Sequence, residues 1–287
     1  MIPIVTRFAP APTGYLHLGH VLNALYVWDI ARASGPDSRV LLRIEDHDRA
    51  RSRPEYEAAL LEDLAWLGFT ADGPLTRQSE RGGLYERALG GLRNRGLTYA
   101  CDCSRSDIGS GPYPGTCRDK HLAESDSVGM RVRIDSARER FDDLRLGRQE
   151  QVPSQQCGDL LVRDRHGNWT YQFAAVVDDW LQGVNLVIRG EDLLDSTGRQ
   201  IQLARLLGSE QPPVFLHHEL LMKSPTQKLS KSDGDSGVRD LRARGWSAEK
   251  VIAHAAKLAG AEARGIRDLG LGIRSATGIA RVQRDQT

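Results

Sequence analysis

The stretch Arg7-Phe8-Ala9-Pro10-Ala11-Pro12-Thr13-Gly14-Tyr15-Leu16-His17-Leu18-Gly19-His20, followed later by Arg43-Ile44-Glu45-Asp46, decides the fold of this 287-residue chain. An apolar run leads into a turn held by prolines and glycine, and the His-Leu-Gly-His step opens a helix with apolar residues at helical spacing. A helix N-terminus offers unpaired backbone N–H groups and the positive end of its dipole, which suit phosphate. The sequence therefore predicts a strand–turn–helix unit that binds an anionic nucleotide. His17 and His20 would add hydrogen bonds to phosphate, and two ordinary surface histidines are the alternative.

A second motif, Lys228-Leu229-Ser230-Lys231-Ser232, follows about 210 residues later in a loop rich in Pro, Gly and Asp. Two ammonium groups on a polar loop can follow the charge of a polyphosphate as a bond breaks. Lys228 and Lys231 are therefore candidate catalytic residues. Neither a GxxxxGK phosphate loop nor a GxGxxG fingerprint occurs, which disfavours the commoner nucleotide-binding families.

Strand and helix patterns alternate along the chain, which predicts an α/β fold with a parallel, doubly wound sheet. An irregular segment follows residue 101 and ends near residue 184. We interpret it as an insertion between the two halves of the sheet. The expected strands are 39–44, 130–134, 160–163, 171–177, 186–189 and 215–221, and the expected helices are 53–68, 79–94, 197–207 and 247–259.

The pairing of the HLGH and KLSKS motifs resembles the signature pair of class I aminoacyl-tRNA synthetases. Longer strings resemble the catalytic half of glutamyl-tRNA synthetases over residues 4–235: Arg7 to His20, Arg43 to Asp46, Gln78-Ser79-Glu80-Arg81, Tyr171 with Val176-Val177-Asp178-Asp179, and Val187-Ile188-Arg189-Gly190-Glu191-Asp192. About 50 residues follow the second motif, fewer than the anticodon-binding region of those enzymes requires. A short chain with a Cys-rich insertion resembles the glutamyl-queuosine tRNA(Asp) synthetases, which are truncated paralogues.

The resemblance implies a Rossmann-like class I synthetase fold with an inserted zinc-containing subdomain and a short helical tail. The expected division is 1–100 for the first half of the nucleotide-binding domain, 101–184 for the insertion, 185–237 for the second half with the KLSKS loop, and 238–287 for the tail, without an anticodon-binding domain.

By the same resemblance, ATP is held by His17, Gly19, His20 and Lys231, with Mg²⁺ accompanying the nucleotide. Glutamate contacts are expected at Arg7, Phe8, Ala9, Pro10, Ala11, Glu45, Tyr171 and Arg189. Arginine pairs with carboxylate through two parallel hydrogen bonds, which suits an acidic amino acid, and Glu45 would take the α-ammonium group. An ion-pair cluster of Arg43, Glu45 and Asp46 at a strand end is the structural alternative.

Cysteines cluster in the insertion: Cys101, Cys103 and Cys117 lie within about seventeen residues, whereas Cys157 stands apart. Three thiolates supply three of the four tetrahedral ligands of zinc. From the residues alone the fourth ligand is open between Tyr113, Asp107 and His121, and reduced structural thiols are the alternative to a metal. The resemblance implies the set Cys101, Cys103, Tyr113 and Cys117 around one structural Zn²⁺.

The implied activity is ATP-dependent formation of glutamyl-adenylate without tRNA, then transfer of glutamate to queuosine in the anticodon loop of tRNA(Asp). A short glutamyl-tRNA synthetase that charges a 3′ end and a non-catalytic nucleotide- or RNA-binding relic are the alternatives. Residues 238–287 carry ten Lys/Arg against five Asp/Glu, a weak RNA signal that a solvated helical face also explains.

No apolar run approaches membrane length and no signal-peptide pattern is present, so we expect a cytoplasmic monomer without a membrane partner. Two positions depart from the family pattern, Leu193 and Gly198, where relatives often carry His and Pro. Both departures are expected near the nucleotide side of the site.

Overall fold

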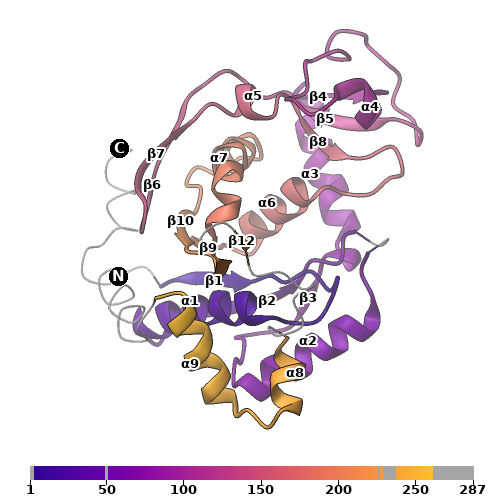
Figure 1. The fold of residues 1–287 in the computed structure, drawn as a ribbon. Helices are drawn as coiled ribbons and strands as arrows, with labels where there is room; N and C mark the ends of the chain where they lie inside the picture. Colours follow the sequence, from indigo (N-terminus) through magenta and orange to yellow (C-terminus); the bar gives the residue numbers. More distant parts are fainter. Residues whose placement is uncertain (1–2, 49–50, 225–226, 229–236, 261–287) are drawn as a thin grey trace. The chain divides into compact units, whose positions relative to one another are not determined.

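The computed structural model describes residues 3–48, 51–224, 227–228 and 237–260, and these form two compact units. Of these described residues, the first unit takes those within 3–77, 184–192 and 214–260, and the second takes 78–183 and 193–213 (Figure 1). Among the described residues, no helix has the length and apolar character needed to cross a membrane.

The first unit is built on parallel strands. Its elements are β1 (Val5–Phe8), α1 (Leu18–Ala33), β2 (Arg39–Ile44), α2 (Pro54–Leu67), β3 (Thr76–Arg77), β9 (Leu186–Gly190), β10 (Val214–His218), β11 (Met222–Ser224), β12 (Gln227–Lys228), α8 (Val238–Ala243) and α9 (Ala248–Leu258). β1 pairs with β2, β2 with β3, and β9 with β10, each pair in parallel. β9 lies beside β1, because Asn185 at its start donates from its backbone N to Val5 O at 3.0 Å.

The strand order is therefore β3-β2-β1-β9-β10, and the chain changes direction across the sheet between β1 and β9. Open α/β sheets bind ligands in the crevice beyond the carboxyl ends of the strands at such a switch point. The carboxyl ends of β1 and β9 are Phe8 and Gly190.

Helix α1 covers this sheet and is itself covered by α9 (Figure 1). Ten of its sixteen residues are buried, which is the behaviour of a helix that is apolar on most of its circumference. Leu22, Val27 and Ile30 have no exposed surface. The helix that carries the HLGH motif therefore has a fixed direction relative to β1.

The second unit combines helices with antiparallel strands. Its elements are η1 (Gln78–Glu80), α3 (Gly82–Asn94), β4 (Thr98–Cys101), α4 (Arg105–Ile108), β5 (Gly129–Val132), β6 (Glu139–Asp143), β7 (Gly147–Gln151), α5 (Pro153–Gln156), β8 (Leu160–Arg163), α6 (Tyr171–Leu181) and α7 (Thr197–Leu206), and η2 (Glu191–Ser196) spans the boundary of the two units. β4, β5 and β8 form one antiparallel sheet, and β6 and β7 form a hairpin.

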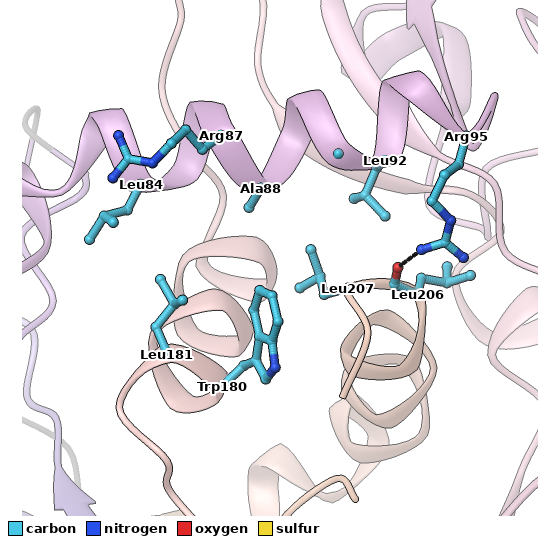
Figure 2. Close-up of a pocket in the computed structure, with 10 residues that line it drawn as sticks. Leu84, Arg87, Ala88, Leu92, Arg95, Trp180, Leu181, Leu206 and Leu207 are labelled. Atoms are coloured by element: carbon cyan, nitrogen blue, oxygen red, sulfur yellow. Dashed lines mark hydrogen bonds between the residues drawn. The ribbon is translucent and has the colours of Figure 1, made fainter. Parts of the chain in front are cut away.

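Helices α3, α6 and α7 of this unit share one core with β5 and β8, which includes Leu89, Met130, Val162, Phe173 and Leu203. The buried carboxylate of Asp178 on α6 fixes α3, because it accepts hydrogen bonds from Gln78, Arg81 and Tyr85. Outside this core, the three helices line an open groove (Figure 2).

Most expected elements are confirmed within one to three residues, but the strand expected at 171–177 is wrong. These residues form the first two turns of α6. A short apolar run that is buried on most sides does not reveal its period, so it is read equally well as a buried strand or a buried helix.

Candidate functional site

The HLGH motif caps its own helix. His17 is the N-cap of α1, with its Nδ1 accepting the Gly19 N–H at 3.1 Å, and the His20 Nδ1 accepts the His17 N–H at 3.2 Å. The two ring centroids lie 3.9 Å apart. A neutral imidazole that accepts a hydrogen bond at Nδ1 carries its proton on Nε2. Both rings thus present an N–H donor at the positive end of a helix, which suits a phosphate oxygen.

Gly19 allows this arrangement because the His17 ring lies directly against it. A Cβ atom at position 19 would meet Cε1 of His17 at 2.9 Å and Nδ1 at 3.0 Å. Any larger residue must therefore displace the ring.

Two buried arginines lie on the neighbouring strands β1 and β9, at the switch point of the sheet. Arg7 on β1 donates from Nη1 to the carbonyl of Ile188 at 3.4 Å, and Ile188 precedes Arg189 on β9. Both side chains are at most 5% exposed. Two buried guanidinium groups at this part of the sheet favour an anionic ligand such as a carboxylate.

The turn 9–14 and the end of β2 lie at the same edge of the sheet, since β1 and β2 are parallel. Glu45 is buried, and its backbone N donates to Pro10 O at 3.0 Å. Its carboxylate lies 3.5 Å from Nη2 of Arg43, so the ion pair of the structural alternative is present. Phe8 and Pro10 are buried, whereas Ala9 and Ala11 are partly exposed.

Three polar residues of this edge were missed by the sequence interpretation. Asn23 on α1 contacts both the Ile188 carbonyl, at 3.4 Å, and Nε2 of His218, at 3.0 Å. His217 is fully buried and lies 3.0 Å from Nε of Arg189. The signal that points to them is a pair of histidines at the carboxyl end of an apolar strand, where a buried polar residue needs a partner.

The second motif lies mostly outside the described residues, and Lys231 is among those not described. Lys228 belongs to β12, whose backbone pairs with β11 at Met222. Beyond the motif, Gly237 forms a backbone bridge with His17, and Val238 N donates to Leu16 O at 2.9 Å. The chain therefore returns to the start of α1 directly after the KLSKS loop.

Tyr171 begins α6 in the second unit. Leu193 and Gly198 also belong to this unit, within η2 and α7. The backbone N of Gly198 donates to Oε1 of Gln151 at 2.8 Å, and a Cβ atom there would meet the same oxygen at 2.8 Å. Glycine at this position thus accommodates the Gln151 side chain.

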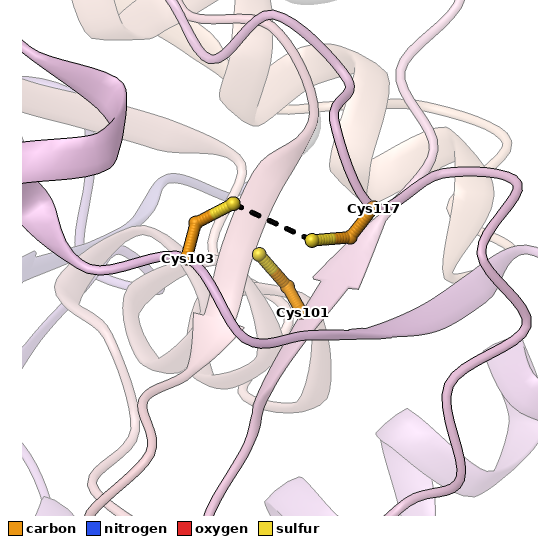
Figure 3. Close-up of side chains that lie close together, drawn as sticks. All are labelled: Cys101, Cys103 and Cys117. Atoms are coloured by element: carbon orange, nitrogen blue, oxygen red, sulfur yellow. Dashed lines mark hydrogen bonds between the residues drawn. The ribbon is translucent and has the colours of Figure 1, made fainter.

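The cysteine cluster is assembled in the second unit (Figure 3). The sulfur atoms of Cys101, Cys103 and Cys117 lie within 4.8 Å of one another. Ligand atoms on a tetrahedron with Zn–S bonds of 2.3 Å are separated by about 3.8 Å. Three sulfurs at this spacing fit the zinc site that the sequence predicts.

Among the candidates for a fourth ligand, Tyr113 is in direct contact with one of the sulfurs. Its hydroxyl is 3.6 Å from Sγ of Cys101 and accepts the Cys117 N–H at 2.7 Å. The carboxylate of Asp107 instead caps α4 through Ser104 N at 2.7 Å. His121 is exposed. Cys157 donates its thiol to Pro153 O and is outside the cluster.

The pKa values of Cys101 and Cys103 are shifted in opposite directions. Burial raises the pKa of Cys101, but its hydrogen bonds with Arg131, which donates at 3.2 Å, and with Tyr113 outweigh burial and lower that pKa overall. Burial, with the neighbouring Cys117 and Cys101, raises the pKa of Cys103 to about 12. A bound metal would displace these protons, since thiolates are the ligands of zinc.

Comparison with known proteins shows which family this chain belongs to. The model of the class I tRNA synthetases (E and Q), catalytic domain, matches residues 3–111 and 116–275. The chain belongs to this family. The expected α/β fold with a parallel sheet is thus confirmed as the class I synthetase catalytic fold, and the family resemblance of the sequence motifs is confirmed with it.

Relatives of this class I synthetase include the "Glutamyl-Q tRNA(Asp) synthetase" of Rhodobacter capsulatus, which is 42% identical over 85% of this chain and 96% of its own length. The protein of the same name from Pseudomonas fluorescens is 43% identical over 79% of this chain and 76% of its own length. The solved glutamate tRNA ligase of Elizabethkingia meningosepticum superposes with a TM-score of 0.71 at 29% identity. It matches 82% of this chain, which spans about half (53%) of that enzyme.

Proposed function

We propose that the protein activates L-glutamate with ATP and transfers it to queuosine in the anticodon loop of tRNA(Asp). The buried arginines Arg7 and Arg189 carry the first half of this proposal, because they lie on β1 and β9, two strands that the HLGH helix packs against, and would offer a carboxylate site to complement its phosphate site. The similarity to proteins named Glutamyl-Q tRNA(Asp) synthetase, along 96% of the length of one of them, supports the acceptor.

Activation requires a carboxylate oxygen of glutamate to attack the α-phosphorus of ATP, with pyrophosphate leaving. Such a step depends on positioning and on stabilising the charge of the leaving group. His17, His20 and the Gly19 N-terminal turn would hold phosphate, and Lys228 and Lys231 would steady the departing pyrophosphate. Mg²⁺ would accompany the nucleotide.

Glutamate would bind along residues 8–11, with its carboxylates on Arg7 and Arg189 and its ammonium group on Glu45. Tyr171 would close the pocket. Since all but Tyr171 belong to one unit, we propose that activation proceeds without tRNA.

Zinc would be structural, held by Cys101, Cys103, Tyr113 and Cys117, with no ligand from substrate. Elemental analysis of protein prepared without chelator should give about one zinc per chain. Cys103→Ser should lose the metal, whereas Cys157→Ser, outside the cluster, should retain it. A metal-free wild-type protein would contradict this site.

Labelled glutamate tests the function directly. Pyrophosphate exchange into ATP that depends on glutamate, without tRNA, is expected, and Lys231→Ala should lower its rate by about two to three powers of ten. Label should then appear in the anticodon fragment of tRNA(Asp) only when queuosine is present. Label at the 3′ end of tRNA(Glu) would instead identify a short glutamyl-tRNA synthetase, and absence of exchange would identify a non-catalytic protein.

A further inference from the structure

The groove between α3, α6 and α7 lies within the second unit and serves none of the roles assigned above (Figure 2). Its cavity measures about 380 Å³, which falls in the range of ligand pockets. Leucine and alanine side chains line most of it, and Trp180 forms one wall; the lining residues are Leu84, Ala88, Leu92, Leu181, Leu206 and Leu207, with Gly91 in α3.

Two apolar side chains of this groove face solvent. Trp180 is 40% exposed and Leu181 is 46% exposed, and they are two of only four large apolar side chains exposed in the described part of the chain. They are adjacent at the end of α6. A contiguous exposed apolar patch on a hydrated surface commonly marks a binding site.

The groove also carries positive charge without matching negative charge. Arg87 makes no hydrogen bond or ion pair within the described residues, whereas its neighbours on α3 are paired, Arg81 with Asp178 and Arg93 with Glu124. Arg95 donates only to a carbonyl, that of Leu206. No acidic side chain lines the cavity. The groove is therefore complementary to a ligand that combines an apolar surface with anionic groups on both sides.

Arg87 and Arg95 are eight residues apart on one helix, a separation of about 12 Å along its axis. An unpaired nucleotide has the matching layout, since the faces of its base are apolar and phosphates flank it on both sides. Unstacked bases bind to proteins by stacking on aromatic side chains and on arginine planes. An acidic amphipathic helix of another protein is the competing occupant, but a synthetase of this family already has an RNA partner.

We infer that this groove binds an unpaired nucleotide of tRNA, with the base against Trp180 and the flanking phosphates on Arg87 and Arg95. This inference rests on the proposed tRNA substrate. It adds a contact on the second unit that is separate from the HLGH helix and from the cysteine cluster.

Binding of tRNA(Asp), measured by fluorescence anisotropy at two salt concentrations, tests the inference. Trp180→Leu keeps an apolar side chain at this position but removes the stacking surface, and it should weaken binding roughly 5- to 100-fold. Trp180→Tyr should restore most of the affinity. Arg87→Gln and Arg95→Gln should each reduce the salt dependence of log Kd by about one unit.

The control variant is Arg140→Gln, an exposed arginine of β6 that pairs with Glu150, and it should bind tRNA like the wild type. Glutamate-dependent pyrophosphate exchange should be unchanged in all variants, since none of these residues belongs to the proposed catalytic site. A fully paired RNA duplex should bind without dependence on Trp180.

The other possible results of these binding experiments distinguish the nucleotide site from the proposed tRNA substrate. Wild-type binding that the groove variants leave unchanged overturns the nucleotide site alone. Failure of the wild type to bind any tRNA contradicts the proposed acceptor as well. Groove variants that alter the sedimentation of the protein but not its RNA binding would assign the groove to a protein contact and would also overturn the nucleotide site.

Discussion

Gly19 shows how one residue determines the geometry of a phosphate site. The His17 ring folds back over the start of α1 only because position 19 has no side chain, and Nδ1 of His17 then satisfies the Gly19 N–H. Gly19→Ala should turn the ring away, which removes the cap and misplaces an Nε2–H donor. We expect the free energy of unfolding to fall by about 1 kcal/mol. Glutamate-dependent pyrophosphate exchange should fall roughly 100-fold.

Gly90→Ala provides the control for this substitution. Gly90 lies in helix α3, and a Cβ atom there meets nothing within 4 Å. Alanine at an unobstructed helical position stabilises slightly, by about 0.5–1 kcal/mol. Normal pyrophosphate exchange in Gly19→Ala would show that the His17 ring does not position phosphate.

At the scale of single residues, the sequence predicted the residues of the motifs but not the distant residues that contact them in the fold. The HLGH turn and the three clustered cysteines are local patterns, so their proximity follows from short spacing. Asn23 reaches His218 and Arg189 reaches His217 only because β10 pairs with β9 and α1 packs on β9, which requires the tertiary fold. Likewise, Arg131 reaches Cys101 across the antiparallel pairing of β4 and β5.

At the scale of elements, one buried carboxylate ties the strands of the second unit together. Asp159, at the start of β8, accepts hydrogen bonds from Tyr99 on β4 at 2.6 Å, from Ile134 N at 2.8 Å, and from Arg118. Burial raises the pKa of Asp159, but the Arg118, Tyr99 and Ile134 donors outweigh it and hold that pKa below its usual value. The ionised form is therefore the one that stabilises the fold.

Asp159→Asn should lower the free energy of unfolding by about 2 kcal/mol at pH 7. Because the pKa of Asp159 is depressed in the folded state, its stabilisation is complete above the unfolded-state pKa of about 4 and is lost as pH falls through the lower native value. Urea denaturation at pH 7 and at pH 3 should show the difference between variant and wild type shrinking at low pH. A difference that is independent of pH would contradict the role of the carboxylate charge.

A second link between elements joins α8 to the HLGH segment. Arg239 on α8 lies over the ring of Tyr15, pairs with Glu62 at 2.5 Å, and has Nε at 3.4 Å from the fully buried carboxylate of Asp63. Burial raises the pKa of Asp63, and Arg239 opposes that shift. The backbone N–H of Val238, the residue before Arg239, donates to the carbonyl of Leu16, the residue before His17. The ion pair of Arg239 and Asp63 therefore helps to position the segment that leads into His17.

Arg239→Met should therefore destabilise the protein by roughly 2 kcal/mol, because it leaves Asp63 uncompensated, and it should raise the KM for ATP in pyrophosphate exchange. Adding Asp63→Asn should recover most of the stability but not the KM. Arg242→Met is the control, since Arg242 shares Glu62, at 2.9 Å, without contacting Asp63. An unchanged KM in Arg239→Met would show that α8 does not position His17.

The periodicity of apolar residues predicted helices and strands most reliably where only one face of the element is buried. The helix expected at 53–68 is α2, with Pro54 in its first turn and Gly68 in the left-handed conformation that ends it. The strand expected at 160–163 is β8. The run at 171–177 failed because Phe173, Ala174 and Val177 are buried without leaving a polar face to reveal the helical period.

At the scale of the whole molecule, the two compact units divide the proposed chemistry. The HLGH turn, Arg7, Glu45 and Arg189 belong to the first unit, whereas the cysteine cluster, Tyr171 and the groove belong to the second. The core around the cluster is small, with Tyr99, Cys101, Tyr113 and Cys117 as its buried members. A metal that joins residues 101–103 to residue 117 should therefore contribute much of the local stability there.

Removal of zinc should therefore destabilise the second unit and leave the first unit unchanged. After treatment with a chelator, amide hydrogen exchange should accelerate at least tenfold in β4, β5 and residues 102–120, while α1, β1 and β2 keep their protection. Glutamate-dependent pyrophosphate exchange should persist within about threefold, since the residues proposed for activation, apart from Tyr171, lie in the first unit. The Cys157→Ser protein, treated in parallel, should behave as the wild type. Equal loss of protection in both units, or loss of exchange activity on chelation, would show that the metal supports the whole fold rather than the insertion alone.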